Sequence, residues 1–183
     1  VYLNKDYASI KGLTFSLTKR YDPITRISAF LDYGFQISEG NSVSSGSFYF
    51  NTLTGIQEEK RVVPLSWDQR HIVNATVTYN HFNKWGASLI GKISSGWPYT
   101  PNIPFANYVP EPNSDRKPWQ KNVNARIFKS FKLKNHSLVL FAKVYNLFDN
   151  LNEKYVYNDT GRSGYTFINR SSQETETLTK HYG

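Results

Sequence analysis

Few side chains in this sequence are spaced for catalysis or metal binding. The four histidines, His71, His81, His136 and His181, are scattered, and none has a second ligand at metal-site spacing. The chain has no cysteine, which excludes a disulfide framework and a thiolate metal site within it. No glycine-rich phosphate loop, nucleophile elbow or catalytic carboxylate pair occurs in the context that its chemistry needs. We therefore expect no catalysed reaction, no cofactor and no metal.

Aromatic side chains are the better candidates for ligand contact, because an exposed ring otherwise leaves apolar area in water. They gather in three irregular stretches of the chain. The alternative is that these rings pack the loops against one another. The candidates are Phe48, Tyr49 and Phe50 in the first stretch, Tyr99, Phe105, Tyr108 and Trp119 in or beside the second, and Tyr155, Tyr157 and Tyr165 in the third.

The elements that would position these rings are strands, because apolar and polar residues alternate along six segments. A period of two places successive side chains on opposite faces of a sheet. The clearest segment is the second, and the last is apolar on both faces. The six predicted strands cover residues 12–18, 26–38, 73–80, 87–94, 122–131 and 138–148.

The connections between these segments alternate strictly between short and long. Turns of a few residues follow the first, third and fifth strands, and residues 39–69 and 98–118 follow the second and fourth. Loops of that length are unusual in a compact soluble sandwich. Short turns at one end and long loops at the other are typical of outer-membrane barrels. We therefore predict an all-β chain, part of an antiparallel up-and-down transmembrane β-barrel, with about six strands and long extracellular loops.

The composition agrees with strands that meet an apolar medium on one side and water on the other. Aromatic residues make up 16% of the chain, yet the mean hydropathy is −0.54. No apolar run reaches the roughly 18 residues of a membrane-spanning helix. Aromatic rings at both ends of the strands fit the preference of Tyr and Trp for membrane interfaces, although a soluble sheet can also carry aromatics beside its turns. These rings are Tyr21, Phe82 and Trp85 near the short turns and Trp97 and Tyr99 near a long loop.

Polar positions of the strands would face the lumen of such a barrel, among them Arg26, Asp32, Lys92 and Arg126. The net charge of +8 predicts either attraction of anionic ligands or ordinary lumen lining with ion pairs elsewhere in the barrel. The basic residues are dispersed through the sequence, so nucleic acid is not an expected partner.

Four segments occur in an order that is similar to one protein family. Residues 63–71 read VPLSWDQRH, residues 95–101 read SGWPYTP, residues 124–131 read NARIFKSF, and residues 144–149 read VYNLFD. In this order, with these loop lengths, they resemble late barrel strands of the TonB-dependent receptors of the bacterial outer membrane. The resemblance is to the subgroup with a carboxypeptidase-regulatory-like N-terminal module, and it covers most of residues 60–161.

This resemblance implies energised uptake of a scarce, unidentified small ligand, without catalysis. Residues 1–183 would be a C-terminal portion of the barrel, supplying wall and outer loops, with residues 150–183 forming most of the last extracellular loop. The implied partners are outer-membrane lipid, the remaining barrel strands, a plug domain and, through that plug, TonB. Signal peptide, plug and final strand are not expected in this chain, and six strands are too few to close a barrel.

Two other functions remain open at this point. One is a passive or adhesive outer-membrane barrel, which would share the strand pattern but lack a plug. The other is a soluble all-β ligand-binding module, in which the apolar faces of the strands would form a core.

Overall fold

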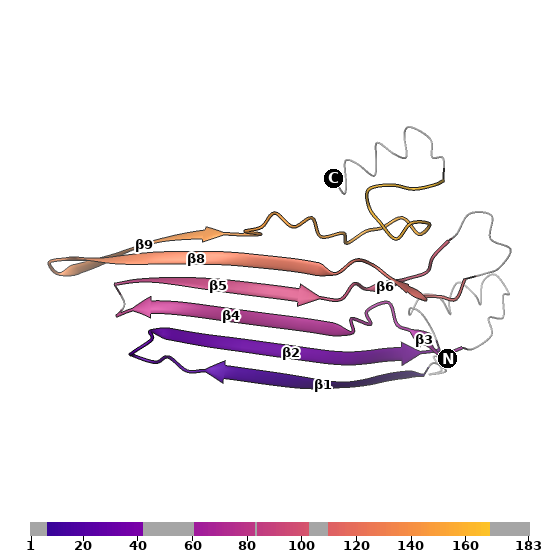
Figure 1. Cartoon of the computed structure of the whole chain (residues 1–183), viewed down its shortest axis with the longest axis horizontal. Coiled ribbons are helices and arrows are strands. Elements are labelled where there is room, and N and C mark those ends of the chain that lie inside the picture. The colour runs from indigo at the N-terminus through magenta and orange to yellow at the C-terminus, as the bar shows by residue number, and fades with distance from the viewer. Residues whose placement is uncertain (1–6, 42–60, 83, 103–109, 169–183) are drawn as a thin grey trace, which may run out of the picture.

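The computed structural model describes residues 7–41, 61–82, 84–102 and 110–168, and its regular structure is entirely β (Figure 1). Neighbouring strands of the main sheet are antiparallel and follow one another in chain order, which confirms the predicted antiparallel all-β architecture. Within these ranges, no helix is long and apolar enough to cross a membrane. The six long strands are β1 (Ala8–Lys19), β2 (Ile27–Gly40), β4 (His71–His81), β5 (Trp85–Ser94), β8 (Gln120–Leu133) and β9 (His136–Val144).

Three two-residue strands lie within the long connections, where irregular chain was predicted. β3 (Val63–Pro64) pairs with the end of β2. β6 (Pro98–Tyr99) pairs with β7 (Asp115–Arg116) in a separate two-stranded sheet. All three lie at the same end of the main sheet, which we call the loop end; the opposite end, with the three short turns, is the short-turn end (Figure 1).

The strand register gives the sheet two chemically different faces. Odd-numbered residues of β1, β2, β4, β5 and β8 share one face, with the even-numbered residues of β9, and we call this the apolar face. One row across it joins Leu17, Leu31, Ala75, Gly91 and Val123. The opposite, polar face carries mostly Ser, Thr, Asn and charged residues, although it also contains Phe30 and Ile90.

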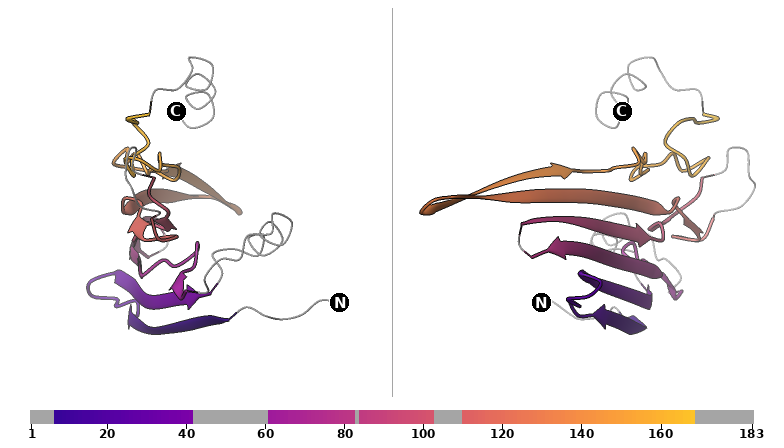
Figure 2. Two further views of the ribbon diagram at one scale, coloured as in Figure 1. Left: turned by 90° about the vertical axis from the view of Figure 1, so that its right-hand side faces the viewer. Right: turned by 60° about the vertical axis from the view of Figure 1, so that its left-hand side comes forward.

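The apolar face has no second layer of described chain against it, as the two views of Figure 2 show. Phe15, Leu17 and Leu89 each leave more than half of their area exposed. Buried hydrophobic residues of the described part are few, namely Val63, Leu65 and Tyr99, and they lie at the loop end. Burial of apolar side chains normally supplies the main stabilisation of a fold. The sheet therefore lacks an internal core among its described residues.

The last long strand is shorter than predicted. β9 ends at Val144, so the prediction of a strand through residue 148 is wrong. Asn146 and Asp149 adopt positive φ angles of 50° each, which a strand does not allow. The Asn146 side chain accepts a hydrogen bond from the Asn150 amide (3.1 Å) and donates one to the Asn150 carbonyl (3.2 Å). These local bonds compete with strand pairing and turn the chain.

Candidate ligand-contacting site

The loop end is where the described chain is packed most tightly. Apart from Gly86, every buried residue of the described ranges belongs to the strand ends and loop segments there. Segments 61–70, 95–102, 110–119 and 145–168 meet around the ends of β2, β4, β5 and β8 (Figure 1). A ligand approaching from this end would meet these segments first.

A buried carboxylate, Asp68, joins two of these segments, 61–70 and 110–119, to the end of β2. Its side chain is fully buried and accepts hydrogen bonds from the Ser38 amide (2.7 Å), from Arg70 Nε (2.8 Å) and from Arg116 Nη2. Arg116 Nη1 also donates to the Asp68 carbonyl (2.7 Å). We call Ser38, Asp68, Arg70 and Arg116 the Asp68 cluster. It ties the end of β2, the chain leading into β4, and β7 to one another.

The protonation of Asp68 is governed by two opposing effects. Burial raises the pKa of this carboxyl. The hydrogen bonds from Arg70, from the Ser38 amide and from Arg116 together lower the pKa by more than burial raises it, so that it lies below its usual value of 3.8. Asp68 is therefore ionised at neutral pH and offers its lone pairs to donors within the protein. The cluster is an anchor for the loops, with no free carboxylate for proton transfer.

The lowered pKa of Asp68 predicts an acid-sensitive loop anchor. When the pKa of a carboxyl is lower in the folded than in the unfolded state, the carboxyl contributes its full stabilisation at every pH above its pKa in the unfolded state. We expect this contribution to be constant above about pH 5, to fall as the pH drops below 3.8, and to vanish below the folded pKa. Unfolding free energies measured from pH 6 to pH 2 should show the loss in the unaltered chain. The Asp68→Asn variant should lack that part of the pH dependence; an identical profile would contradict the assignment.

The β6–β7 pair lies within the second loop (residues 98–118) and contacts the third loop (residues 145–168). Tyr99 is buried and donates a hydrogen bond to Asp115 Oδ2 (3.0 Å). Burial, this bond and the charge of Asp115 raise the pKa of Tyr99 to about 12. Gly161 lies so close that a Cβ there would be 2.3 Å from the Tyr99 hydroxyl, and its φ of 65° also favours glycine. The Asn102 amide donates to the Asn158 carbonyl (2.7 Å), which joins the second loop to the third.

The third loop is fixed by its own ionic contacts. Burial raises the pKa of Glu153, but the hydrogen bonds from the Ser163 amide and from Arg162 bring it below the usual value. The Glu153–Arg162 ion pair measures 2.8 Å. Lys117 donates to the Lys154 carbonyl (2.8 Å), and burial lowers the pKa of Lys117. Hydrogen bonds and ion pairs thus join the described segments of the loop end to one another.

The structure distributes the predicted ligand-contacting aromatics over different environments. Tyr99 is buried and packs between loops, as the alternative for these rings predicted. Trp119, the residue before β8, is half exposed and stacks on His71 of the apolar face with ring centroids 5.8 Å apart. Tyr155 and Tyr165 are exposed on the third loop, where Lys117 lies 5.9 Å from the Tyr155 ring centre and Tyr157 is partly buried. Phe48, Tyr49, Phe50, Phe105 and Tyr108 lie outside the described residues.

Three of the four residues predicted to face a lumen share the polar face. Asp32 and Lys92 belong to one row across five strands, with Asn74 between them. Ser16 donates a hydrogen bond to Asp32 (2.6 Å) from the same row. Arg126 lies in another row of this face, opposite Ser88. The polar face therefore presents rows of hydrogen-bonding groups, and the row between these two also contains Phe30 and Ile90.

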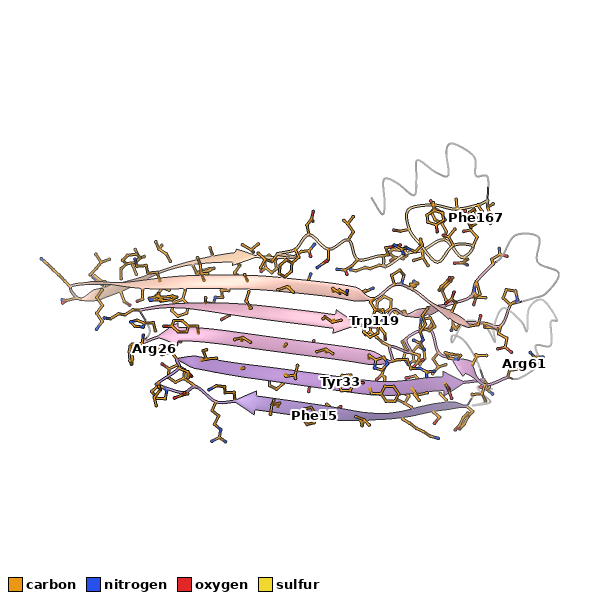
Figure 3. All side chains as sticks on the ribbon, viewed as in Figure 1. Phe15, Arg26, Tyr33, Arg61, Trp119 and Phe167 are labelled. Carbon is orange, nitrogen blue, oxygen red and sulfur yellow. The ribbon has the colours of Figure 1, made fainter. Side chains whose placement is uncertain are left out.

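Arg26 differs from the other three. It precedes β2 with a positive φ of 59°, which breaks the alternation that predicted its direction. Its guanidinium group contacts Tyr79 (3.5 Å) and His81, two residues of the apolar face, and lies 4.7 Å from the centre of the Phe82 ring. Figure 3 labels Arg26 at the short-turn end of the sheet.

Two aromatic rows, which the sequence pattern did not predict as groups, border the apolar face. The loop-end row contains Tyr33, Phe35, His71 and Trp119, with ring centroids 5.2 to 6.2 Å apart. Figure 3 labels Tyr33 and Trp119 near this end. The short-turn row contains Tyr79, His81 and Trp85, with centroids 5.0 and 6.1 Å apart. Odd numbering and strand register were the signals that could have grouped them.

The spacing of the two rows can be estimated from β4. This strand has 11 residues from His71 in one row to His81 in the other. At about 3.3 Å per residue, the rows are about 33 Å apart along the strand. A strand tilt of about 40° would reduce this to a height of about 25 Å.

Comparisons of the chain with protein-family models, with curated proteins and with solved structures find no match.

Proposed function

We propose that this chain forms part of the wall and outer loops of a transmembrane β-barrel in a bacterial outer membrane. The observation that carries the proposal is the exposed apolar face between two aromatic rows. Outer-membrane barrels have an apolar band about 25 Å tall with aromatic girdles at both borders. Lipid would cover this band, while water or protein would meet the polar face.

The edges of the sheet also support a larger assembly. β1 and β9 are the two ends of the strand order, and each has only one neighbour in the main sheet among the described residues. Backbone groups in lipid need hydrogen-bond partners, so a membrane sheet must close. We propose that further strands pair with β1 and β9 and complete the barrel.

Within this class we propose a TonB-dependent receptor that takes up a scarce small ligand. The motifs described above in residues 63–71, 95–101, 124–131 and 144–149 support this assignment. The Asp68 cluster suits it, because an ordered loop base can hold ligand-contacting loops over an open lumen. The Asp32, Lys92 and Arg126 side chains would line that lumen and meet either the ligand or a plug domain.

Membrane extraction of the native protein tests the barrel. We expect it to stay in the membrane fraction after high-salt and alkaline washes and to be released by detergent. Release by salt or alkali alone would contradict a membrane wall and favour a soluble binding module.

Uptake measurements separate an energised receptor from a passive barrel. Candidate iron chelates, vitamins, glycans and peptides would be supplied to cells that make the native protein, with and without functional TonB. A ligand whose uptake needs both the protein and TonB supports the receptor. Uptake that persists without TonB would indicate a passive barrel.

A further inference from the structure

The short-turn end of the sheet is strongly basic. Its three turns and the adjoining strand ends carry seven basic side chains and one acidic side chain, Asp22. Because the net charge of the whole chain is +8, most of the positive excess lies at this end. The basic residues are Lys19, Arg20, Arg26, Lys84, Lys129, Lys132 and Lys134.

The single acidic residue at this end is already engaged. Asp22 accepts hydrogen bonds from the Ile24 amide (3.0 Å) and from the Thr25 hydroxyl (2.8 Å), and it lies 3.9 Å from Lys19. It shapes the turn between β1 and β2 and leaves the other six cations unneutralised by a carboxylate from the described turns.

The loop end has a different charge arrangement. Carboxylates lie among its cations, and four of its arginines form ion pairs with them. These are Arg70 with Asp68 and Glu39, Arg116 with Asp68, Arg61 with Glu111, and Arg162 with Glu153. The excess of one sign is therefore a property of the short-turn end and not of the whole surface.

Exposed rings and aliphatic side chains lie among these cations. Lys129 pairs in register with Trp85, and its ammonium group lies 5.1 Å from the centre of the Phe131 ring. Lys129 is the last residue of β8 that pairs with β5, and β8 continues beyond it, so that the β8–β9 hairpin projects past the neighbouring strands (Figure 1). Leu133 and Leu138 are exposed on this projection, beside Lys132 and Lys134.

We propose that the short-turn end binds the headgroups of an anionic phospholipid layer. The cations would contact lipid phosphates, while Trp85, Phe82 and Phe131 would lie at the border of the acyl chains. A lipid layer is the partner that presents anionic groups at the edge of an apolar medium, which matches cations placed at the edge of an apolar face. This inference rests on the proposed barrel wall.

The test compares two triple variants of the native protein with equal loss of charge. The first is Lys129→Gln, Lys132→Gln and Lys134→Gln, which removes the cations of the β8–β9 hairpin. The control is Lys11→Gln, Lys121→Gln and Lys154→Gln, which removes three lysines at the loop end. A third variant with arginine at 129, 132 and 134 keeps the charge and checks that substitution of the hairpin is tolerated.

Each purified protein would be titrated in neutral detergent micelles with a short-chain phosphatidylglycerol, and with phosphatidylcholine as the uncharged probe. One basic residue near an anionic surface contributes about a fivefold gain in affinity, so loss of three predicts a decrease on the order of a hundredfold at low salt. The unaltered protein, the control and the arginine variant should bind phosphatidylglycerol alike. Equal affinity of all four proteins, or an equal loss in the control, would overturn the proposal.

Two further readouts distinguish the possible failures. Insertion of the unaltered protein into phosphatidylcholine nanodiscs tests the wall alone, because no anionic lipid is present. Insertion without lysine-dependent phosphatidylglycerol binding would overturn this inference and leave the wall intact, whereas lysine-dependent binding without insertion would support the lipid surface and contradict the wall. Binding of a single-stranded oligonucleotide through the same lysines, with no response to phosphatidylglycerol, would also overturn the inference.

Discussion

The Val77→Arg substitution is expected to destabilise the membrane-inserted protein by about 2–4 kcal/mol, the cost of an arginine on the lipid face of a barrel near the bilayer midplane. Val77 is on the apolar face of β4, close to the middle of the strand, and is half exposed. The measurement is the free energy of unfolding in urea, with the protein folded into phospholipid vesicles. On a face exposed to water, the same change would cost little, because an arginine can be solvated there.

The neighbouring residue supplies a matched control. Thr76 is on the polar face of the same strand, between Phe30 and Ile90 in the register. Thr76→Arg adds the same charge at the same depth, and we expect a change within about 0.5 kcal/mol. Equal effects of the two substitutions would contradict the assignment of the faces to lipid and water.

Removal of the Asp68 carboxylate should have the second large effect. Asp68→Ala leaves Arg70 and Arg116 without their shared partner, and breaking a buried ion pair costs about 3–5 kcal/mol. We expect about 3 kcal/mol, the lower end of that range, because 28% and 30% of these arginine side chains remain accessible to water. The loops should also become more sensitive to protease, since the cluster joins three segments.

Glu111 provides the control for this change. Its ion pair with Arg61 measures 3.5 Å and is well exposed at the same end of the sheet. Exposed ion pairs contribute little, so Glu111→Gln should leave stability and protease resistance unaltered. A small effect of Asp68→Ala, similar to that of Glu111→Gln, would show that the cluster does not anchor the loops.

Most of the main sheet could be predicted from the sequence, because the sequence features that indicate its strands are local. Alternation of side chains specifies a strand without knowledge of its partner, and the short turns specify which strands are neighbours. The Lys134-Asn135 turn illustrates this, since Leu133 pairs with His136 directly across it. The positive φ of Lys134, 41°, lets two residues reverse the chain.

The errors arose where contacts from elsewhere in the chain decide the structure. β3, β6 and β7 have two residues each, too few for a period of two to be recognised. The end of β9 depends on bonds made by Asn146, including one from its amide to the Asn124 side chain (3.0 Å), 22 residues away.

The candidate surfaces were predicted only in part. Residue types identified Trp119 and Tyr155 as exposed rings, but the same reasoning placed Tyr99 with them, although its partners Asp115 and Gly161 bury it. Asp68 was part of a recognised motif, yet its partner Arg116 is 48 residues away, so its role as an anchor could not be predicted. The predicted direction of the Arg26 side chain was wrong because a positive φ interrupts the strand period there.

A cysteine scan of β4 tests the central proposal most directly, and the chain has no native cysteine to interfere. Single cysteines at residues 72 to 79 would carry spin labels in the membrane-inserted protein. Odd positions should be relaxed by lipid-dissolved oxygen and even positions by a water-soluble nickel chelate, with a period of two. Equal access of the chelate to both sets, or protection of the odd set from both reagents, would contradict a lipid-covered apolar face.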